Sequence, residues 1–541
     1  ISHFHPKHTQ QSAEEVKFTL TSQQSQGKHA WRKGALSLYK ETFSRSNNQV
    51  NYQQWIKTTE TKHYQYIEAT IRNTSTERLI SILLPTYNSN PAYLQQCIES
   101  VQAQSYSNWQ LCIVDDASTQ KEHFELINQF TAQDTRIQFQ QRIENGHISA
   151  ASNSCLEMAK GSYTLLLDHD DTLPPHTLLL LVNKLQNAPQ LELIYADEDK
   201  IDDTNRRFEP HFKPEWNQDL LYSQNYIGHP VLVNTKRLKS LGGFRQGVEG
   251  SQDHDMLLRY TAELETTKIH RIPRILYHWR VHGESTAANT GAKSYTTQAG
   301  IKALQDHFAS QKQNVKVSQG KYPNTYRAHW PIPEQQPLVT LMVPTYNGYE
   351  ILKTCINSIL EKTSFNNYEI LIIDNRTHCP LTLDFIDKAV QKHHQVSVII
   401  WDHPFNYSAI NNFAAAHANG SILGLINNDI EVITPEWLTE MVSHAIRPEI
   451  GCVGAKLYYD NDTIQHAGVI LGIGGVAGHA HKHFPKDSPG YFSRLHLTQN
   501  LSAVTAACLL VKKEVFKQLN GLDQNNLPVA FNDVDFCLRV Q

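Results

Sequence analysis

The sequence predicts an α/β protein built from two tandem copies of one parallel-sheet domain, preceded by a mainly helical N-terminal extension. Two observations carry this prediction. Short motifs recur in the second half of the chain in one register, and in each copy apolar, strand-like runs alternate with helical patterns. Such alternation is typical of parallel strands joined by helical crossovers. With 541 residues the chain has room for about three folding units.

The repeat rests on three pairs of motifs, each separated by 259 residues. The pairs are Ile82 to Asn88 with Leu341 to Asn347, Asp115 with Asp374, and Asp170 with Asp429. A fourth pair, Asp253 and Asp533, is 280 residues apart. The second copy therefore carries an insert, which we place in the Gly- and His-rich stretch 465–484.

The boundaries follow from where this alternation starts and stops. Residues 1–78 lack it and form the expected helical extension, whose Trp55 and Tyr64 we expect to pack on the first core. Residues 79–330 form the first copy with a C-terminal helix and a Pro-rich linker. Residues 331–541 form the second copy. Because the chain stops within a helical pattern, we expect it to be a C-terminally truncated piece of a longer protein.

Each copy opens with a buried strand that ends in Pro-Thr-Tyr-Asn and leads into a helix. In the first copy Ser89 or Asn90 can cap this helix and Pro91 suits its first turn. Apolar residues follow at helical spacing in both copies: Leu94, Cys97, Ile98 and Val101, then Leu352, Cys355, Ile356 and Ile359. A second strand, 111–114 or 370–373, ends at an acidic residue. Ligands are expected where such strands end, at the carboxyl edge.

Composition excludes several classes of protein. Lys plus Arg number 49 and Asp plus Glu 53, so the net charge of −4 argues against nucleic-acid binding and against a polybasic membrane anchor. None of the eight cysteines forms a CxxC motif, which favours reduced thiols. No apolar run is long enough to span a membrane, and the first residues do not resemble a signal peptide. We therefore expect a cytoplasmic protein.

Carboxylates follow the strand-like run 163–167. Asp168 and Asp170 stand at its exit, where they suit Mg²⁺ or Mn²⁺. An acidic turn that merely caps the next helix is the alternative for a single copy. The recurrence of acidic residues at Asp429 and Glu431 favours a metal site. Asn427 replaces Asp168, so the second site is poorer by one carboxylate.

Two further patterns carry chemistry. Gly146 precedes small residues that open a helix and, with Asp115 and Asp116, predicts half of a nucleotide pocket. Asp253 begins an amphipathic helix, where a simple N-cap is the bland interpretation. Its counterpart Asp533 favours a catalytic base, and which Asp of each pair acts, Asp253 or Asp255, stays open.

The order of these motifs resembles the inverting family 2 glycosyltransferases of the GT-A fold, in particular bacterial two-domain members that build cell-surface polysaccharides. The first-copy motifs are Pro85-Thr86-Tyr87-Asn88, Asp115-Asp116, Asp168-His169-Asp170, Gly243-Phe244 and Gln252-Asp253. Tyr195 to Lys200, Lys213 to Asn217 and Tyr277 to Arg280 add to the resemblance. The similarity covers roughly residues 79–290 and 337–541.

The resemblance implies a nucleotide-diphospho-sugar donor and a divalent cation, Mn²⁺ or Mg²⁺. The donor-binding positions are Pro85, Thr86, Tyr87, Asp115, Asp116, Gly146 and Asp168, with Pro344, Thr345, Tyr346 and Asp374 in the second copy. The metal positions are Asp168 and Asp170 with His278 or His282, and Asp429 with Glu431. Asp253 and Asp533 match the acceptor base. The acid that usually precedes the base is Gln252 or Asn532, so like-charge repulsion should raise the pKa of the base less.

The implied reaction is metal-dependent transfer of a sugar, with inversion, to a hydroxyl of a glycan or lipid-linked acceptor during synthesis of bacterial cell-surface polysaccharide. Peripheral association with the inner membrane, at its cytoplasmic face, is compatible with it.

Two alternatives stay open. One copy, more readily the second, is a non-catalytic glycan-binding or scaffold module. The other is a sugar nucleotidyltransferase, which the lack of basic residues after the first strand disfavours. For the 465–484 insert, a mobile loop over the donor or acceptor is favoured over a zinc site.

Overall fold

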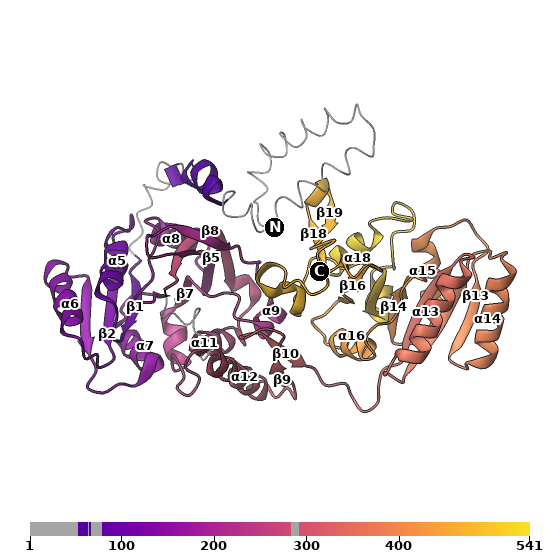
Figure 1. Ribbon diagram of the computed structural model, residues 1–541, viewed down its shortest axis with the longest axis horizontal. Coiled ribbons are helices and arrows are strands. Elements are labelled where there is room, and N and C mark those ends of the chain that lie inside the picture. Colours follow the sequence, from indigo (N-terminus) through magenta and orange to yellow (C-terminus); the bar gives the residue numbers. More distant parts are fainter. Residues whose placement is uncertain (1–51, 63, 66–77, 283–291) are drawn as a thin grey trace. The chain divides into compact units, whose positions relative to one another are not determined.

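The computed structural model describes residues 52–62, 64–65, 78–282 and 292–541 (Figure 1). The chain divides into two compact units. The first holds residues up to 313 with 317–327 and 497–499, and the second holds 314–316, 328–496 and 500–541. Each unit is built around its own α/β sheet.

The first unit contains an eight-stranded sheet of order β3-β2-β1-β4-β7-β5-β6, with β8 paired to β5. The strands are β1 (Ile80–Thr86), β2 (Trp109–Asp115), β3 (Ile137–Gln141), β4 (Tyr163–Leu166), β5 (Leu193–Ile201), β6 (Arg207–His211), β7 (Val231–Asn234) and β8 (Ile269–Arg280). The pairs β1–β2, β1–β4 and β2–β3 are parallel, as the strand–helix alternation predicts. The sheet becomes mixed at β7, which is antiparallel to both β4 and β5.

Helices connect these strands as the apolar spacing predicts. They are α5 (Pro91–Gln102), α6 (Lys121–Gln133), α7 (His147–Met158), α8 (Thr177–Asn187), α9 (Gln218–Ser223), α10 (Thr235–Ser240), α11 (Gln252–Thr261) and α12 (Ala292–Ser310), with a 3-10 turn at Thr266–Lys268. Asn90 caps α5 by accepting from the backbone N–H of Ala92. The four apolar residues expected on the inner face of α5 are fully buried.

The second unit repeats the plan in a six-stranded sheet of order β13-β12-β11-β14-β20-β15. Its strands are β11 (Val339–Thr345), β12 (Tyr368–Asp374), β13 (Val396–Ile400), β14 (Ile422–Ile426), β15 (Cys452–Gly454) and β20 (Cys508–Lys512). Its helices are α13 (Tyr349–Lys362), α14 (Pro380–Lys392), α15 (Tyr407–His417), α16 (Trp437–Ala445), α17 (Lys513–Gln518) and α18 (Asn532–Val540). The registers of β1 with β2 and of β11 with β12 match residue for residue.

Two segments differ from the expectations. The Gly- and His-rich insert 465–484, predicted as a mobile loop, contains the paired short strands β18 (Val469–Leu471) and β19 (Ala477–His479). At its start, β17 (Ile464–His466) pairs with β16 (Leu457–Tyr458), which lies before the insert. Short 3-10 segments lie at Ile473–Gly475 and Tyr491–His496. The Pro-rich linker likewise begins with a hairpin of β9 (Lys316–Gln319) and β10 (Tyr326–His329), in whose turn Pro323 lies. Proline fits there because a turn needs no ladder hydrogen bond.

The described part of the N-terminal extension, residues 52–62 and 64–65, is helical and includes a π-helical turn at Ile56–Glu60. Trp55 packs edge-on against Phe212, and the Tyr64 hydroxyl donates to the carbonyl of Ile275 at 2.7 Å. These aromatic residues therefore pack on the first unit, as predicted. The remainder of the extension, 1–51 and 66–77, lies outside the described residues, as does residue 63.

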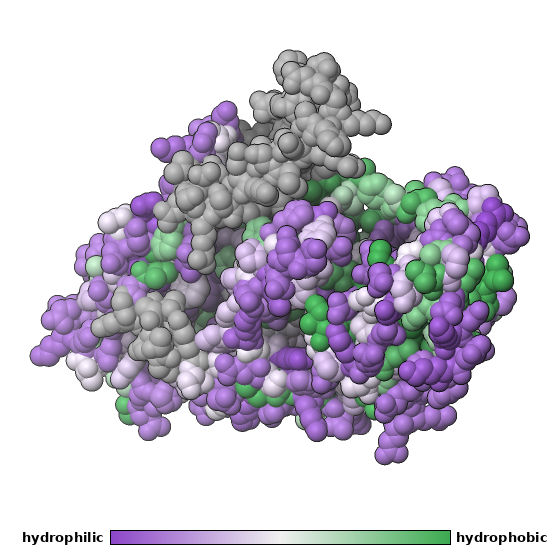
Figure 2. All heavy atoms as spheres, turned by 45° about the vertical axis from the view of Figure 1, so that its right-hand side comes forward, coloured by the Kyte–Doolittle hydropathy of each residue, from purple (hydrophilic) through white to green (hydrophobic). Residues whose placement is uncertain are grey.

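The surface and the thiols agree with the composition. On the face in Figure 2, hydrophilic residues predominate and apolar ones form separate patches. Within the described ranges, no helix combines the length and the apolar character that crossing a membrane requires. All eight cysteines are free.

Candidate functional site

The carboxyl ends of three parallel strands bring most of the predicted residues of the first unit to one edge of the sheet. Strand β1 ends at Thr86, β2 at Asp115 and β4 at Leu166, just before the turn that holds Asp168. Antiparallel β7 lies beside β4 and begins two residues after His229. This strand order therefore places His229 next to the acidic turn.

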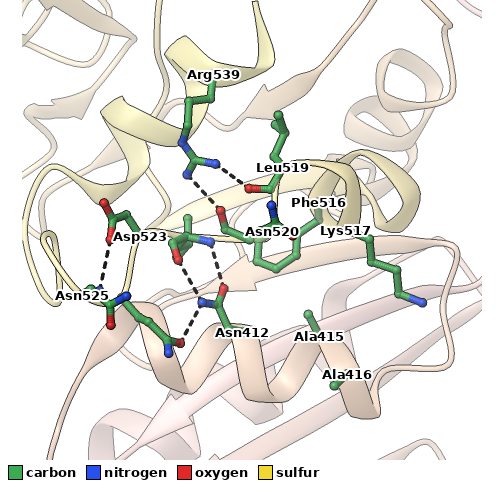
Figure 3. Close-up of a pocket in the computed structure, with 13 residues that line it drawn as sticks. Asn412, Ala415, Ala416, Phe516, Lys517, Leu519, Asn520, Asp523, Asn525 and Arg539 are labelled. Carbon is green, nitrogen blue, oxygen red and sulfur yellow. Dashed lines mark hydrogen bonds between the residues drawn. The ribbon is translucent and has the colours of Figure 1, made fainter.

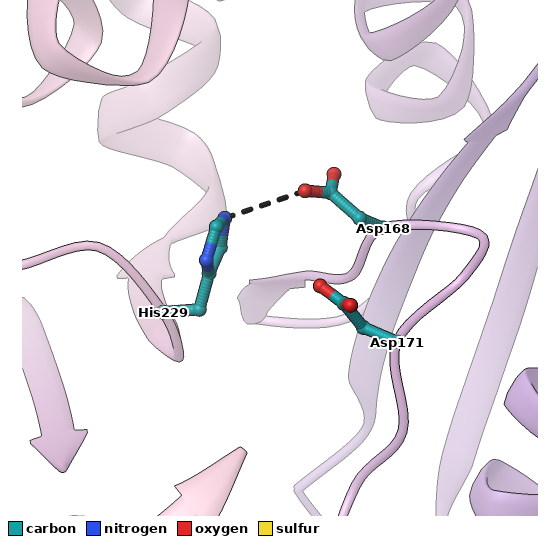
Figure 4. A group of neighbouring side chains, drawn as sticks. All are labelled: Asp168, Asp171 and His229. Atoms are coloured by element: carbon teal, nitrogen blue, oxygen red, sulfur yellow. Dashed lines mark ion pairs between the residues drawn. The ribbon is translucent and has the colours of Figure 1, made fainter. Parts of the chain in front are cut away.

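Asp168, Asp171 and His229 form the one group of three potential metal ligands found among the residues that the structure describes (Figure 4). One ligand atom from each lies within 4.8 Å of the others. Nε2 of His229 is 3.5 Å from Oδ2 of Asp168, whose side chain is 40% exposed. Asp168 is thus open to a ligand, whereas Asp171 is buried and His229 is half-buried.

Buried partners fix the two inner members of the group. Asp171 accepts from the Tyr277 hydroxyl at 2.5 Å and from the backbone N–H of Arg280 at 2.7 Å. Burial, together with the charges of Asp170 and Asp168, raises the pKa of Asp171 well above its usual value. Although burial lowers the pKa of His229, Glu198 and Asp168 outweigh it and raise that pKa to about 10. The negative charge of the carboxylates around His229 therefore favours its protonated, positively charged ring.

The two histidines proposed to complete the metal site have different surroundings. Nε2 of His282 is 2.9 Å from Oδ2 of Asp170, so these two predicted residues do meet. Nδ1 of His278 instead lies 2.5 Å from Asp199, a fully buried carboxylate. His278 is therefore occupied by a structural contact, and neither histidine joins the group of Asp168 and Asp171.

The two aspartates of α11 differ in their contacts. Asp255 is buried and ion-paired with Arg245 at 2.6 Å and Arg259 at 2.8 Å. Asp253 has one weak contact, a 3.3 Å hydrogen bond from the Gln252 amide. Burial and the charge of Asp168 raise the pKa of Asp253 to about 6. Asp253 is thus the available carboxylate. Its pKa is raised mainly by burial, although Gln252 replaces the acid that usually precedes the base.

Asp255 belongs to an Asp–Arg clamp that both units share: an aspartate holds an arginine, and the arginine donates to two carbonyls of a preceding turn. Arg259 donates to the carbonyls of Leu241 and Gly243, and Arg539, held by Asp535 at 2.9 Å, donates likewise to Leu519 and Gly521. The glycines have φ of 66° and 69°, and a Cβ on either would lie 2.2 Å from an Asn side chain. The Asp-x-Asp-x-x-x-Arg repeat therefore joins one free carboxylate to one structural ion pair.

Figure 3 shows the second clamp beside a cavity of about 680 Å³. Arg539, Asn412 and the turn 519–525 line this cavity. None of the predicted site residues lies in its wall. The cavity is therefore separate from the carboxyl-edge site.

Asp115 and Asp116, predicted to bind the nucleotide, form hydrogen bonds with other residues of the first unit. Asp115 is fully buried against Nε2 of His123 at 2.9 Å and the backbone N–H of Ser118 at 2.8 Å. Burial raises its pKa, but the His123 and Ser118 hydrogen bonds outweigh this and leave the pKa below its usual value. Asp116 accepts from Arg142 at 2.8 Å and from the backbone of Gly146 at 3.0 Å.

These contacts revise the role of Gly146 and leave other groups accessible. Gly146 has φ of −122°, so close packing, not left-handed backbone, calls for glycine: a Cβ would lie 2.8 Å from the Cβ of Ala150 on the next turn of α7. Tyr87 is 49% exposed at the end of β1, while Pro85 is half-buried and Thr86 buried. Tyr87 and Asp168 are thus the accessible groups here.

The second unit has the same strand ends but a different acidic turn. Pro344, Thr345, Tyr346 and Asp374 occupy the corresponding positions, with Tyr346 56% exposed. Asp429 is exposed, and the exposed Glu431 pairs with Lys362 at 2.9 Å. By the repeat and the strand register, Asn427, Ile430 and Ala507 stand where the first unit has Asp168, Asp171 and His229. The three-membered group is thus absent from this unit's described residues.

Asp533 takes the place of Asp253 on α18. It accepts from the backbone N–H of Ala506 at 3.1 Å. Burial, then the charge of Asp533, raises the pKa of the neighbouring Tyr407. The second unit therefore keeps the candidate base where the acidic turn has changed.

The donor set of the first unit fits a divalent cation. Carboxylate oxygens suit Mg²⁺ and Mn²⁺. His229, whose raised pKa favours the protonated ring, would ligate a cation only after losing that proton. Asp168 offers an exposed oxygen, and a cation would offset the charges of Asp170 and Asp168, which act after burial to raise the pKa of Asp171.

Two members of this group were missed by the sequence. Asp171 directly follows the predicted pair Asp168 and Asp170 but was not among the predicted ligands. His229 lies in no motif and reaches the site because β7 is antiparallel to β4. Its one sequence signal, the histidine before a strand-like Val231–Asn234 run, carries no metal-binding spacing.

Comparison with known proteins identifies the family. The family model described as glycosyl transferase family 2 matches residues 81–240 and 340–519. The O-antigen biosynthesis protein RfbC of Myxococcus xanthus is 35% identical over 495 residues, which are 91% of this chain and 38% of RfbC. An uncharacterized protein of Sinorhizobium fredii, y4gI, is 46% identical over 472 residues, 87% of this chain and 52% of that protein. The chain thus spans about half or less of these relatives.

Solved structures give weaker matches. Staphylococcus aureus TarS in complex with UDP-GlcNAc aligns with 42% of this chain and 72% of its own, at 16% identity and a TM-score of 0.34. A mannosyltransferase of Pyrobaculum calidifontis, solved with GDP-Man and Mn²⁺, covers 46% and 71% at the same identity and score. The family model covers more than half of the chain, in the two regions that hold the α/β sheets. The chain belongs to glycosyltransferase family 2 and carries two copies of its GT-A-type α/β domain.

Proposed function

We propose that the first unit is a metal-dependent, inverting glycosyltransferase that moves a sugar from a nucleoside-diphosphate donor to an acceptor hydroxyl. One observation carries the proposal. The charge of Asp168 contributes to the raised pKa of Asp253, the available carboxylate of α11. This supports a candidate base and a candidate cation site at one edge of the sheet. The accessible Tyr87 at the end of β1 is assigned to the nucleotide, and Asp115 and Asp116 shape the wall behind it.

The residues suit direct displacement. Asp253 takes the proton of the acceptor hydroxyl while the hydroxyl oxygen attacks the anomeric carbon and the nucleoside diphosphate leaves. Because no enzyme nucleophile intervenes, the anomeric centre inverts. A pKa of about 6 leaves Asp253 mostly ionised near neutral pH. Such a base typically contributes about 10² to 10⁴ in rate. Asp168, Asp171 and His229 would hold the cation, which supplies charge stabilisation for the departing diphosphate. Asp170 and His282 stand beside them as a pair.

We assign the same chemistry to the second unit, with Asp533 as its base and a weaker cation site near Asp429 and Glu431. A non-catalytic glycan-binding role is the second candidate for this unit. It is favoured by Asn427, Ile430 and Ala507 at the positions of the first unit's ligand group.

The relatives point to a class of product. RfbC is named for O-antigen biosynthesis, and a 27% identical Escherichia coli protein, matched over 39% of this chain, is named chondroitin synthase. We therefore propose a glycan or lipid-linked acceptor, used at the cytoplasmic face of the inner membrane in synthesis of cell-surface polysaccharide.

Donor turnover by the full chain tests the proposal. UDP-, dTDP- and GDP-sugars with Mn²⁺ should release nucleoside diphosphate, and NMR of a transferred sugar should show the inverted anomer. Asp253→Asn and Asp533→Asn chains separate the two units, since each should lose its own share. If neither variant lowers release, the assignment of both bases is wrong. Release of pyrophosphate from a sugar 1-phosphate and a nucleoside triphosphate would instead indicate a nucleotidyltransferase.

A further inference from the structure

The insert that distinguishes the second unit places two histidines next to its candidate base. His466 ends β17 and His479 ends β19, and their Nδ1 atoms lie 2.8 Å apart. His466 is 1% exposed. The hairpin of β18 and β19 is anchored to the segment that precedes β20 through a bridge between Val469 and Ala503. The histidine pair is therefore built into the fold of this unit.

Adjacent backbone amides connect the pair to Asp533. The N–H of Thr505 donates to Nε2 of His466 at 3.3 Å, and the N–H of the next residue, Ala506, donates to Oδ2 of Asp533 at 3.1 Å. The imidazole and the carboxylate thus bind consecutive amides in the turn that precedes β20. The charge of Asp533 also acts on the pKa of His479, against burial and Lys482, which lower it.

The hydrogen bonds fix the tautomer of both rings. Nε2 of His466 accepts from two amides, those of Gly468 and Thr505, each at 3.3 Å, so it carries no proton. Neutral His466 must then be protonated on Nδ1 and must donate to Nδ1 of His479. Burial and His479 lower the pKa of His466 to about 3, which keeps the ring neutral at physiological pH. Neutral His479 consequently carries its proton on Nε2.

That Nε2–H is available for a ligand. The side chain of His479 is half-buried, and among the described residues its Nε2 has no hydrogen-bond partner. A donor of fixed orientation beside the base suits a polar group of the substrate. In an in-line displacement the base attends the acceptor, while the diphosphate leaves from the opposite side of the anomeric carbon. A group on the side of Asp533 therefore faces the acceptor.

We propose that His479, held as its Nε2–H tautomer by His466, donates a hydrogen bond to an oxygen of the acceptor sugar and so selects the acceptor of the second unit. The inference rests on the proposed transferase function of that unit. The motif spacing gives the insert to the second copy alone, so the two units would bind their acceptors differently.

Acceptor kinetics test the role of His479 in the full chain. An Asp253→Asn background silences the first unit, donors are the UDP-, dTDP- and GDP-sugars, and 4-nitrophenyl glycosides serve as acceptor probes. His479→Phe should raise the acceptor KM about five- to tenfold, the range expected for one hydrogen bond, and leave donor hydrolysis in the absence of acceptor unchanged. His479→Gln, whose amide can replace the Nε2–H, should restore the KM. His417→Phe, at an exposed histidine of α15, is the matched control.

Three outcomes overturn the inference, and they are distinguishable. If the second unit is active and His479→Phe leaves its acceptor KM unchanged, the inference is refuted and the proposed function of the unit still stands. Loss of donor hydrolysis in His479→Phe refutes it as well, because the residue would then act on the donor. If Asp533→Asn changes nothing in the Asp253→Asn background, the proposed function of the second unit fails, and the inference falls with it.

The tautomers can be tested without any substrate. In the chain labelled with ¹⁵N-histidine, long-range ¹H–¹⁵N correlation should show a protonated Nδ1 for His466 and a protonated Nε2 for His479 between pH 6 and 8. His466→Leu removes the donor to Nδ1 of His479 and should let that ring populate both tautomers. A protonated Nδ1 on His479 in the unaltered chain would refute the inference.

Discussion

At the scale of residues, Asp253 and Asp255 show how neighbouring carboxylates acquire different tasks. They lie two positions apart in the first turn of α11. Asp255 forms ion pairs with Arg245 and Arg259, which hold its side chain in place. Burial and the charge of Asp168 outweigh the opposing charge of His229 and raise the pKa of Asp253 to about 6. The first is suited to hold structure and the second to exchange a proton.

Transfer by the first unit should weaken in acid. A base with a raised pKa of about 6 is ionised above that pH and protonated below it. At pH 5 the rate should be about tenfold below its plateau, since only the carboxylate accepts the proton. The measurement is the pH profile of kcat in an Asp533→Asn chain, which isolates the first unit. A flat profile between pH 7.5 and 5 would show that Asp253 is not the base.

Asp255→Asn should lower the stability of the first unit by about 2 kcal/mol, because it weakens charge-assisted hydrogen bonds to two arginines. Asp535→Asn is the matched control: Asp535 is 31% exposed and pairs with Arg539 alone, so the loss should be smaller. Hydrogen exchange with mass spectrometry in increasing urea reports each unit separately. Equal losses in the two units would contradict the ranking.

At the scale of elements, the helical segment of residues 52–62 and 64–65 is fixed to the sheet by a buried charge network. Arg207 of β6 contacts Glu60 and Asp199, each at 2.5 Å, and the Tyr52 hydroxyl donates to Asp199 at 2.5 Å. Both carboxylates are at most 5% exposed. The segment is therefore joined to the strands through one arginine that serves two acids.

Arg207→Met should release this segment. The variant leaves the buried Glu60 without its cation and removes one of the two basic partners of Asp199, the other being His278, which should cost about 3 kcal/mol of local stability. Amides of residues 52–62 should then exchange faster with solvent, by mass spectrometry, than in the unaltered chain. Glu209→Gln breaks the largely exposed Lys200–Glu209 pair on the same strand and should change exchange little. Unchanged protection in Arg207→Met would mean that aromatic packing alone holds the segment.

At the scale of the whole molecule, duplication has left two units with one strand plan and different sites. Both keep the parallel strands, the Asp–Arg clamp and a candidate base. The first adds Asp168, Asp171 and His229, whereas the second adds the His466–His479 pair. Divergence is thus concentrated in turns and inserts at the carboxyl edge.

The two units should differ in their need for metal. Donor turnover by the Asp533→Asn chain, which reports the first unit, should require Mn²⁺ and stop with EDTA. Turnover by the Asp253→Asn chain should need a higher Mn²⁺ concentration, by about tenfold or more, because the second unit lacks the three-membered ligand group. Titration of Mn²⁺ against each chain measures this. Identical activation curves would show that Asp429 and Glu431 suffice.

The sequence by itself determined the duplication, the strand–helix order, the buried faces of α5 and α13 and the acidic strand ends, because periodicity and motif spacing are local properties. Only the tertiary structure decided which of these acids stay available. Asp115, Asp116 and Asp255 are satisfied by partners that lie 3 to 30 residues away in the chain. His229 and the His466–His479 pair reach the candidate sites through antiparallel pairing and an inserted hairpin. Such contacts join residues distant in sequence, and no local pattern encodes them.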